Sequence, residues 1–87
     1  MIGVFILKYM CPCCNYFTME HDEAVYHDIC PVCFWENDPI QNDDEKYIGG
    51  SNDSSLSEAK ANYQKFGAVK QEYIKYVRSP YLNEMSK

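Results

Sequence analysis

Five cysteines are the residues of this 87-residue chain whose type and spacing could do chemistry. Four of them form two C-x-x-C pairs, and 15 residues separate the second cysteine of the first pair from the first cysteine of the second. This spacing is typical of a zinc site, and four thiolates in a tetrahedron form the closed, structural kind of site. The pattern predicts that one structural zinc ion is held by Cys11, Cys14, Cys30 and Cys33.

Other chemistry for the same cysteines is less well supported by the sequence. Iron in a rubredoxin-like site takes the same four thiolates, so iron stays open as an alternative metal. A thioredoxin-type dithiol needs a βαβ context, which the pattern does not predict. His27 could replace a cysteine, but four well-spaced cysteines make both His21 and His27 superfluous as ligands. A catalytic zinc would also need an open position, and four cysteines close the coordination sphere.

Cys13 is the one thiol that the two pairs leave over. We interpret it as a small apolar residue packed beside the metal. The alternatives are a redox-reactive thiol and a replacement ligand, and reactivity would require exposure and a lowered pKa. Phe34 and Trp35 directly follow the second pair, and we expect them to cover the site.

The number and placement of the cysteines also bear on the compartment. An odd count, metal-ligand spacing and the lack of a secretory signal favour a reduced, cytoplasmic protein over a disulfide scaffold. The apolar run at residues 2–7 is too short to span a bilayer and has no basic segment before it. We interpret this run as a strand or a packed N-terminal arm, and expect no membrane association.

The chain is predicted to fold as a single α+β domain over residues 1–87, a small zinc-ribbon-like β-hairpin with two short C-terminal helices. Residues 1–35 would supply the N-terminal strand and the hairpin, in which strands 16–19 and 24–29 are joined by the polar residues 20–23. An acidic loop is expected at 36–54, two helices within 55–79 and a fraying tail at 80–87.

The two predicted helices have clear signals at their ends. Ser55 and Glu58 form a capping-box pattern at the start of the first helix, and Gly67 suits its C-terminal end. The second helix is expected at residues 69–78, before Pro80 stops it. Helices this short must pack against the rest of the domain to be stable.

The formal net charge of −5 constrains the partner. A negative protein gains no general attraction to phosphates, which disfavours nucleic acid, and a basic protein surface fits better. The loop 36–54 is either a solvated connection or a surface that contacts this partner. The candidate contact residues in it are Asp38, Asp43, Asp44 and Glu45.

Several motifs together resemble the bacterial cysteine-rich CPCC domain over about residues 9–80. They comprise Cys11-Pro12-Cys13-Cys14, the run from Ile29 to Glu36, Gly49-Gly50, Ser55-Leu56, Glu58-Ala59, Phe66-Gly67-Ala68, Val77-Arg78 and Pro80. The chain departs from the family pattern at Asn15, where a glycine is usual, and in the segment before Lys8. The resemblance implies a small zinc-ribbon-like protein and carries over no catalytic residue.

The leading expectation is a non-enzymatic, zinc-stabilised protein-interaction module. By analogy with small acidic bacterial proteins, a specific version is an immunity protein or antitoxin that neutralises a basic toxin. The alternatives are a nucleic-acid-associated zinc ribbon, and a thiol-based redox or metal-sensing protein that uses Cys13. No catalytic sequence motif appears.

Overall fold

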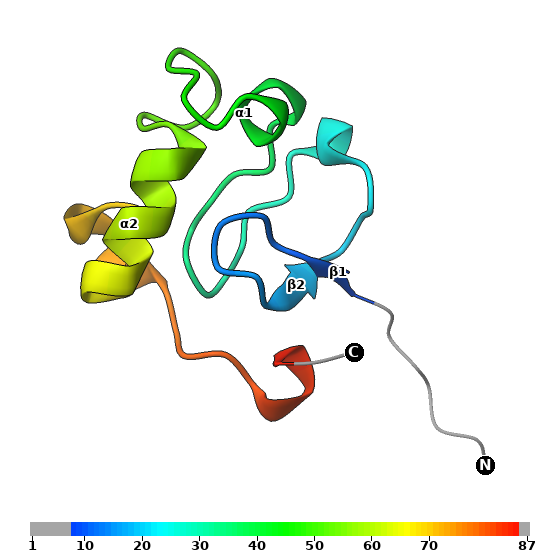
Figure 1. Cartoon of the computed structure of the whole chain (residues 1–87). Coiled ribbons are helices and arrows are strands. Elements are labelled where there is room, and N and C mark those ends of the chain that lie inside the picture. Colours follow the sequence, from blue (N-terminus) through cyan, green and yellow to red (C-terminus); the bar gives the residue numbers. More distant parts are fainter. Residues whose placement is uncertain (1–7, 86–87) are drawn as a thin grey trace.

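The computed structural model describes residues 8–85, so the strand predicted at residues 2–7 lies outside the described part of the chain. The domain is a two-stranded antiparallel hairpin with short helices around it, as the sequence predicts for a small α+β zinc-ribbon-like fold (Figure 1). In chain order its elements are β1 (Tyr9–Met10), β2 (Phe17–Met19), η1 (Ala24–Tyr26), α1 (Pro39–Asp43), α2 (Leu56–Phe66), η2 (Gln71–Tyr76) and η3 (Leu82–Glu84), where η denotes a 3₁₀-helix.

The β-hairpin encloses the first cysteine pair, and this corrects the predicted strand pairing. β2 pairs with β1, with Tyr9 opposite Met19, and does not pair with residues 24–29. The chain reverses within the cysteine turn itself, where Asn15 has a left-handed φ of 68°. The sequence signal for a turn at residues 20–23 was therefore wrong as the connection of the hairpin.

Residues 24–29 form no strand in the described structure. η1 takes up the first part, and His27 ends it with a left-handed φ of 54°. Ile29 then forms an isolated antiparallel bridge with Glu36 across the second cysteine pair. Each cysteine pair is therefore closed by its own short backbone pairing, and the two are not linked by one long hairpin.

The acidic segment 36–54 is more ordered than a solvated loop. It contains α1, which begins at Asp38 because the Asp38 carboxylate accepts hydrogen bonds from the backbone N–H groups of Ile40 and Gln41. Gln41 is fully buried, and its amide contacts the carbonyls of Tyr47 and Ser54. These buried hydrogen bonds from the side-chain amide hold the loop after α1 against the helix.

α2 confirms the first predicted helix at both ends. The hydroxyl of Ser55 accepts a hydrogen bond from the backbone N–H of Glu58, as an N-cap should. Gly67 follows the helix with a φ of 88°, a conformation that costs glycine little. Leu56 and Ala59 form the buried face of the helix and pack in the same cluster as the cysteine turns.

The C-terminal region differs from the prediction in two ways. The second helix is present only as the shorter η2, a 3₁₀-helix. The tail does not fray in the described residues, because η3 follows and contacts β2. Arg78 donates two hydrogen bonds to the buried Glu84 carboxylate and lies over the Tyr81 ring. This pair fixes residues 78–84 to each other.

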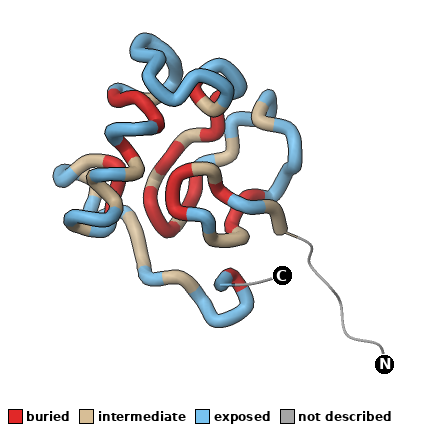
Figure 2. Tube along the Cα trace, in the orientation of Figure 1, coloured by how far each residue is buried: buried red, intermediate tan, exposed pale blue. Residues whose placement is uncertain are grey.

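The core lies where the two cysteine turns meet α2 (Figure 2). Trp35 is the largest fully buried side chain, and Met19, Val32 and Leu56 pack in the same cluster. Because the ligand cysteines belong to this cluster too, the metal site and the hydrophobic core are one structure. No helix in residues 8–85 is long and apolar enough to cross a membrane.

Candidate metal centre

The first cysteine turn presents its sulfurs through the backbone. The N–H of Cys13 points at Cys11 Sγ, with a distance of 3.4 Å from N to S. The N–H of Asn15 donates to the carbonyl of Cys11 at 2.9 Å, which closes the turn. Asparagine tolerates the left-handed conformation better than most other residues with a side chain, so it suits this position of the turn.

The second cysteine turn repeats this geometry. The N–H of Val32 points at Cys30 Sγ at 3.4 Å, and the N–H of Phe34 donates to the carbonyl of Cys30 at 2.8 Å. Phe34 has a φ of 74° and so takes the left-handed position that Asn15 takes in the first turn. Two copies of one local structure therefore face each other.

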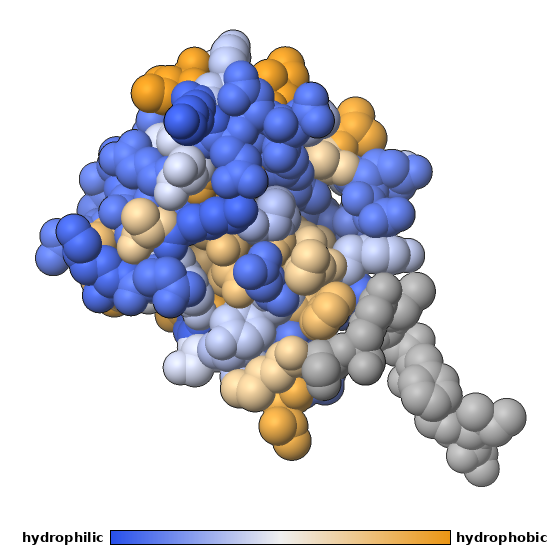
Figure 3. Space-filling model, in the orientation of Figure 1, coloured by the Kyte–Doolittle hydropathy of each residue, from blue (hydrophilic) through white to orange (hydrophobic). Residues whose placement is uncertain are grey.

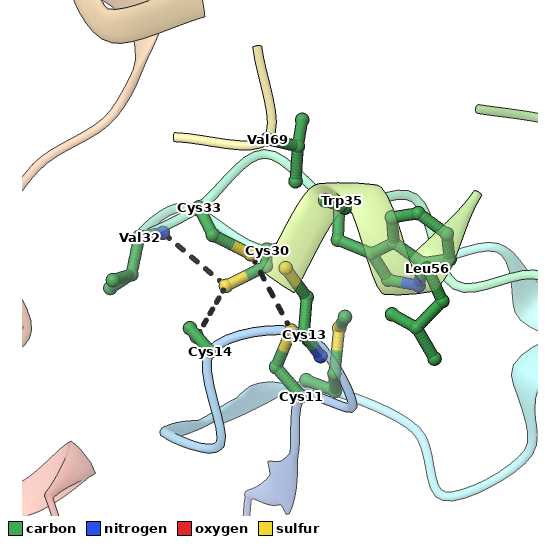
Figure 4. Close-up of a cluster of buried hydrophobic side chains, with 11 residues drawn as sticks. Cys11, Cys13, Cys14, Cys30, Val32, Cys33, Trp35, Leu56 and Val69 are labelled. Carbon is green, nitrogen blue, oxygen red and sulfur yellow. Dashed lines mark hydrogen bonds between the residues drawn. The ribbon is translucent and has the colours of Figure 1, made fainter. Parts of the chain in front are cut away.

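The four predicted ligands come together at one point. Their Sγ atoms all lie within 4.8 Å of one another, and Figure 4 shows the side chains converging from the two turns. The Cys11–Cys33 and Cys14–Cys30 sulfur pairs are 3.6 and 3.7 Å apart. A tetrahedron with metal–sulfur bonds of about 2.3 Å has edges of about 3.8 Å, so the arrangement fits a tetrahedral metal ion.

The site is closed to solvent. Each of the four side chains is at most 8% exposed, and all five cysteines are free thiols. Sulfurs at this separation are not bonded to each other, since the S–S bond is about 2.0 Å long. A buried set of four unpaired sulfurs is the donor set that a structural metal site requires. The cysteines are therefore positioned to bind a metal, as the sequence predicts.

Electrostatics explain why four buried cysteines at this distance would need a metal ion. Hydrogen bonds from the other three ligand cysteines, that from Cys11 being the largest, lower the pKa of Cys30 below its ordinary value. Hydrogen bonding with Cys14 and Cys30 raises the pKa of Cys11. Hydrogen bonding with the neighbouring cysteines, followed by burial, raises the pKa of Cys33. Several thiolates cannot share this volume without a cation to balance their charge. A metal ion resolves the conflict for all four.

Thr18 is a contact of the site that sequence reasoning missed. Its hydroxyl lies 2.9 Å from Cys30 Sγ, and the side chain is buried. A hydroxyl donating to a thiolate is an outer-shell contact that orients the ligand. No signal in the sequence marks Thr18, because it lies in a strand 12 residues from Cys30 and outside both C-x-x-C motifs.

The residues next to the ligands take different positions. Cys13 is 4% exposed and belongs to the core cluster, outside the set of four converging sulfurs. Trp35 is buried with its Nε1 donating to Asn42, and Phe34 packs on the cluster while its ring stacks on Tyr76. Trp35 and Phe34 therefore help to enclose the metal centre.

Neither histidine lies among the converging ligands. His21 contacts the carboxylate of Asp28 and stacks on Tyr26, with ring centres 4.1 Å apart. His27 faces Glu36 and Ser51. The metal-ligating groups found within residues 8–85 are the four cysteines alone.

The acidic candidates divide into one buried and three exposed residues. Asp38 is 6% exposed, and its carboxylate accepts hydrogen bonds from the N–H groups of α1 and of Ser51. Its carboxylate is used inside the fold and offers a partner far less surface than the three exposed residues do, so its role as a partner contact stays a prediction. Asp43, Asp44 and Glu45 are exposed at the end of α1, as a contact surface requires.

The chain matches a known protein family. A comparison with curated proteins gives no match. The model of the family described as Cysteine-rich CPCC matches residues 9–84, which is most of the chain and contains both cysteine turns. With this match and the four-cysteine centre, the chain belongs to the cysteine-rich CPCC family.

Proposed function

We propose that this protein is a zinc-stabilised interaction domain that binds another protein and catalyses no reaction. Zinc suits this site because a closed, buried tetrahedron of four sulfurs is typical of structural zinc sites. With the metal enclosed by the core, the surface is left to carry the function. The specific form of the proposal is an immunity protein or antitoxin that neutralises a toxin with a basic surface.

The observation that carries this proposal is the uneven distribution of charge. Nine of the 13 Asp and Glu residues lie within residues 20–46, which contain a single lysine and no arginine. This stretch includes η1 and α1, which contact each other in the fold. A region with one sign of charge steers a partner of the opposite sign, so a basic protein is the partner that it favours.

The distribution of lysines weighs against a nucleic-acid-binding ribbon. Five basic residues lie in and directly after α2 and η2, and three of these five are already in ion pairs. Lys60 pairs with Glu45, Lys70 with Asp53, and Arg78 with Glu84. Binding of nucleic acid relies on basic groups that are free to neutralise phosphates.

The burial of Cys13 weighs against a thiol-based sensor. A reactive thiol must be reached by its oxidant, and reactive cysteines are partly exposed. Cys13 is packed among Met19, Trp35 and the ligand cysteines of the core cluster. Its environment suits a small apolar residue of the core.

The experiment is a binding measurement with the zinc-loaded full chain. The candidate partner is the protein encoded by the neighbouring reading frame, and calorimetry at two salt concentrations reads the affinity. Binding should weaken at high salt and in the Asp43→Asn/Asp44→Asn variant. The matched control, Glu58→Gln/Glu72→Gln, removes the same number of charges at two exposed positions of the C-terminal half and should bind the partner like the wild type. Equal affinity of the two double variants, or no binding, would overturn the proposal.

A further inference from the structure

The structure carries an exposed apolar group at the end of the molecule where the negative charge is concentrated. Val25 and Tyr26 of η1 and Ile40 of α1 are each more than half exposed. η1 and α1 contact each other, and Figure 3 shows hydrophobic areas over both elements beside hydrophilic ones. We name this region the η1–α1 surface, and it also includes the exposed acidic residues Asp22, Glu23, Asp43 and Asp44.

The acidic residues of the η1–α1 surface are free to meet a partner. Within residues 8–85, no ion pair involves Asp22, Glu23, Asp43 or Asp44. By contrast, Glu20 is paired with Lys8, and Glu45 with Lys60. These exposed carboxylates gain from an approaching cation without losing an ion pair, although the carboxylate of Asp44 also accepts a hydrogen bond from the backbone N–H of Lys46.

The apolar residues are held in place by the fold. The Tyr26 ring stacks on His21, which in turn contacts the carboxylate of Asp28. Ile40 lies in a helix whose N-terminus is capped by the buried Asp38. Side chains on such supported elements lose little conformational freedom on binding, which favours their use as anchors in an interface.

We infer that the η1–α1 surface is the docking site for the partner, and that the partner presents lysine or arginine residues around an apolar centre. This inference rests on the proposed function and specifies its interface. An apolar centre surrounded by polar and charged residues is the ordinary anatomy of a protein interface. The negative charge of the exposed carboxylates in the η1–α1 surface selects a basic partner over an acidic one.

The test uses two synthetic peptides as defined probes. One is a 14-residue amphipathic helix of leucine and lysine, and the other has the same number of lysines with serine in place of leucine. Amide chemical shifts of the zinc-loaded full chain, labelled with ¹⁵N, report where each peptide binds. We expect the leucine–lysine peptide to change the amide chemical shifts of Val25, Tyr26 and Ile40. It should also bind about tenfold more tightly than the serine peptide, because it buries apolar side chains.

Variants make the test specific for the apolar centre. Ile40→Asn and Val25→Asn should each lower the affinity for the leucine–lysine peptide about tenfold. Ile74→Asn, at an exposed position of η2, should leave this affinity unchanged. Metal content and the circular dichroism spectrum confirm that each variant is folded. Shifts confined to other residues, equal binding of the two peptides, or an equal effect of Ile74→Asn would overturn the inference.

The two proposals fail in different ways. If the natural partner binds but Ile40→Asn and Val25→Asn leave its affinity unchanged, the docking site is wrong and the interaction function stands. If no natural partner binds, the interaction function fails whatever the peptides do.

Discussion

Thr18 Oγ1 lies 2.9 Å from Cys30 Sγ, and both side chains are buried. Thr18 belongs to β2, in the hairpin of the first cysteine turn, whereas Cys30 opens the second turn. The contact therefore joins the two halves of the metal centre by a path that does not pass through the metal. Outer-shell partners of this kind orient a ligand and tune its affinity for the ion.

Replacing Thr18 by valine should weaken metal binding. The valine keeps the shape of the side chain but removes the hydroxyl, so Cys30 loses a hydrogen bond and zinc affinity should fall by about 10–100-fold. Competition with a chromogenic chelator measures the affinity. Thr18→Ser keeps the hydroxyl and is the matched control. Zinc binding by Thr18→Val as tight as that of Thr18→Ser would show that the contact does not support the metal site.

Removing the metal should unfold the domain. Zinc bound to a small structural site supplies on the order of 10–16 kcal/mol of apparent binding free energy, which stabilises the folded state. Chelation at neutral pH, or Cys30→Ser, should therefore abolish the cooperative thermal transition followed by circular dichroism. Cys13→Ser should keep one metal ion per chain and a cooperative transition, because Cys13 lies outside the ligand set. A cooperative transition that survives chelation would contradict this prediction.

The left-handed residue of the first turn should tolerate glycine but not valine. Asn15 has a φ of 68°, a conformation that costs an ordinary residue about 1–2 kcal/mol. Asn15→Val should lower the free energy of unfolding of the metal-bound protein by about that amount, measured by urea denaturation. Asn15→Gly should match the wild type or exceed it. Equal stability of the two variants would mean that the turn has a different conformation in solution.

The Arg78–Glu84 pair should stabilise the fold in a pH-dependent manner. The hydrogen bonds from Arg78 hold the pKa of the Glu84 carboxyl below its ordinary value of 4.5. Because the folded-state pKa is lowered, the contribution is fully present above the unfolded-state value and is lost as the pH falls through the folded-state value. Glu84→Gln should cost about 1–3 kcal/mol at pH 7, and this difference should shrink below pH 4.5.

Urea denaturation of the wild type and Glu84→Gln gives this difference at each pH at which the metal content shows one ion still bound per chain, because protons compete with the metal for the thiolates. Glu72→Gln is the control, since Glu72 is exposed and its ion pair with Lys70 is on the surface, where such pairs contribute little. A cost of Glu84→Gln at pH 7 no larger than that of Glu72→Gln would contradict the assignment of the effect to the buried, ionised carboxylate.

Local signals predicted the parts of the structure that depend on neighbouring residues. The cysteine spacing identified the four cysteines whose sulfurs converge, because a tetrahedral site restricts which residues can contribute. The α2 helix was predicted with both its caps, since Ser55 and Gly67 act within one turn of the helix ends. Both features follow from chemistry that is contained in a few consecutive residues.

The features that were missed depend on distant contacts. Residues 24–29 alternate like a strand, but of these residues only Ile29 forms a bridge, with Glu36. The strand predicted to pair with them, β2, pairs with β1 instead. The burial of Asp38 follows from a loop that returns to it at Ser51, 13 residues later. Glu84 is ordered through Arg78. Composition describes these stretches as polar and cannot show which of their polar groups meet inside the fold.

The most direct test of the account is X-ray absorption spectroscopy of the protein as purified, with the metal counted per chain. The account predicts one zinc ion per chain with four sulfur ligands at about 2.3 Å. An iron absorption edge would contradict the choice of zinc. A nitrogen or oxygen ligand in the first shell would contradict the closed centre formed by Cys11, Cys14, Cys30 and Cys33.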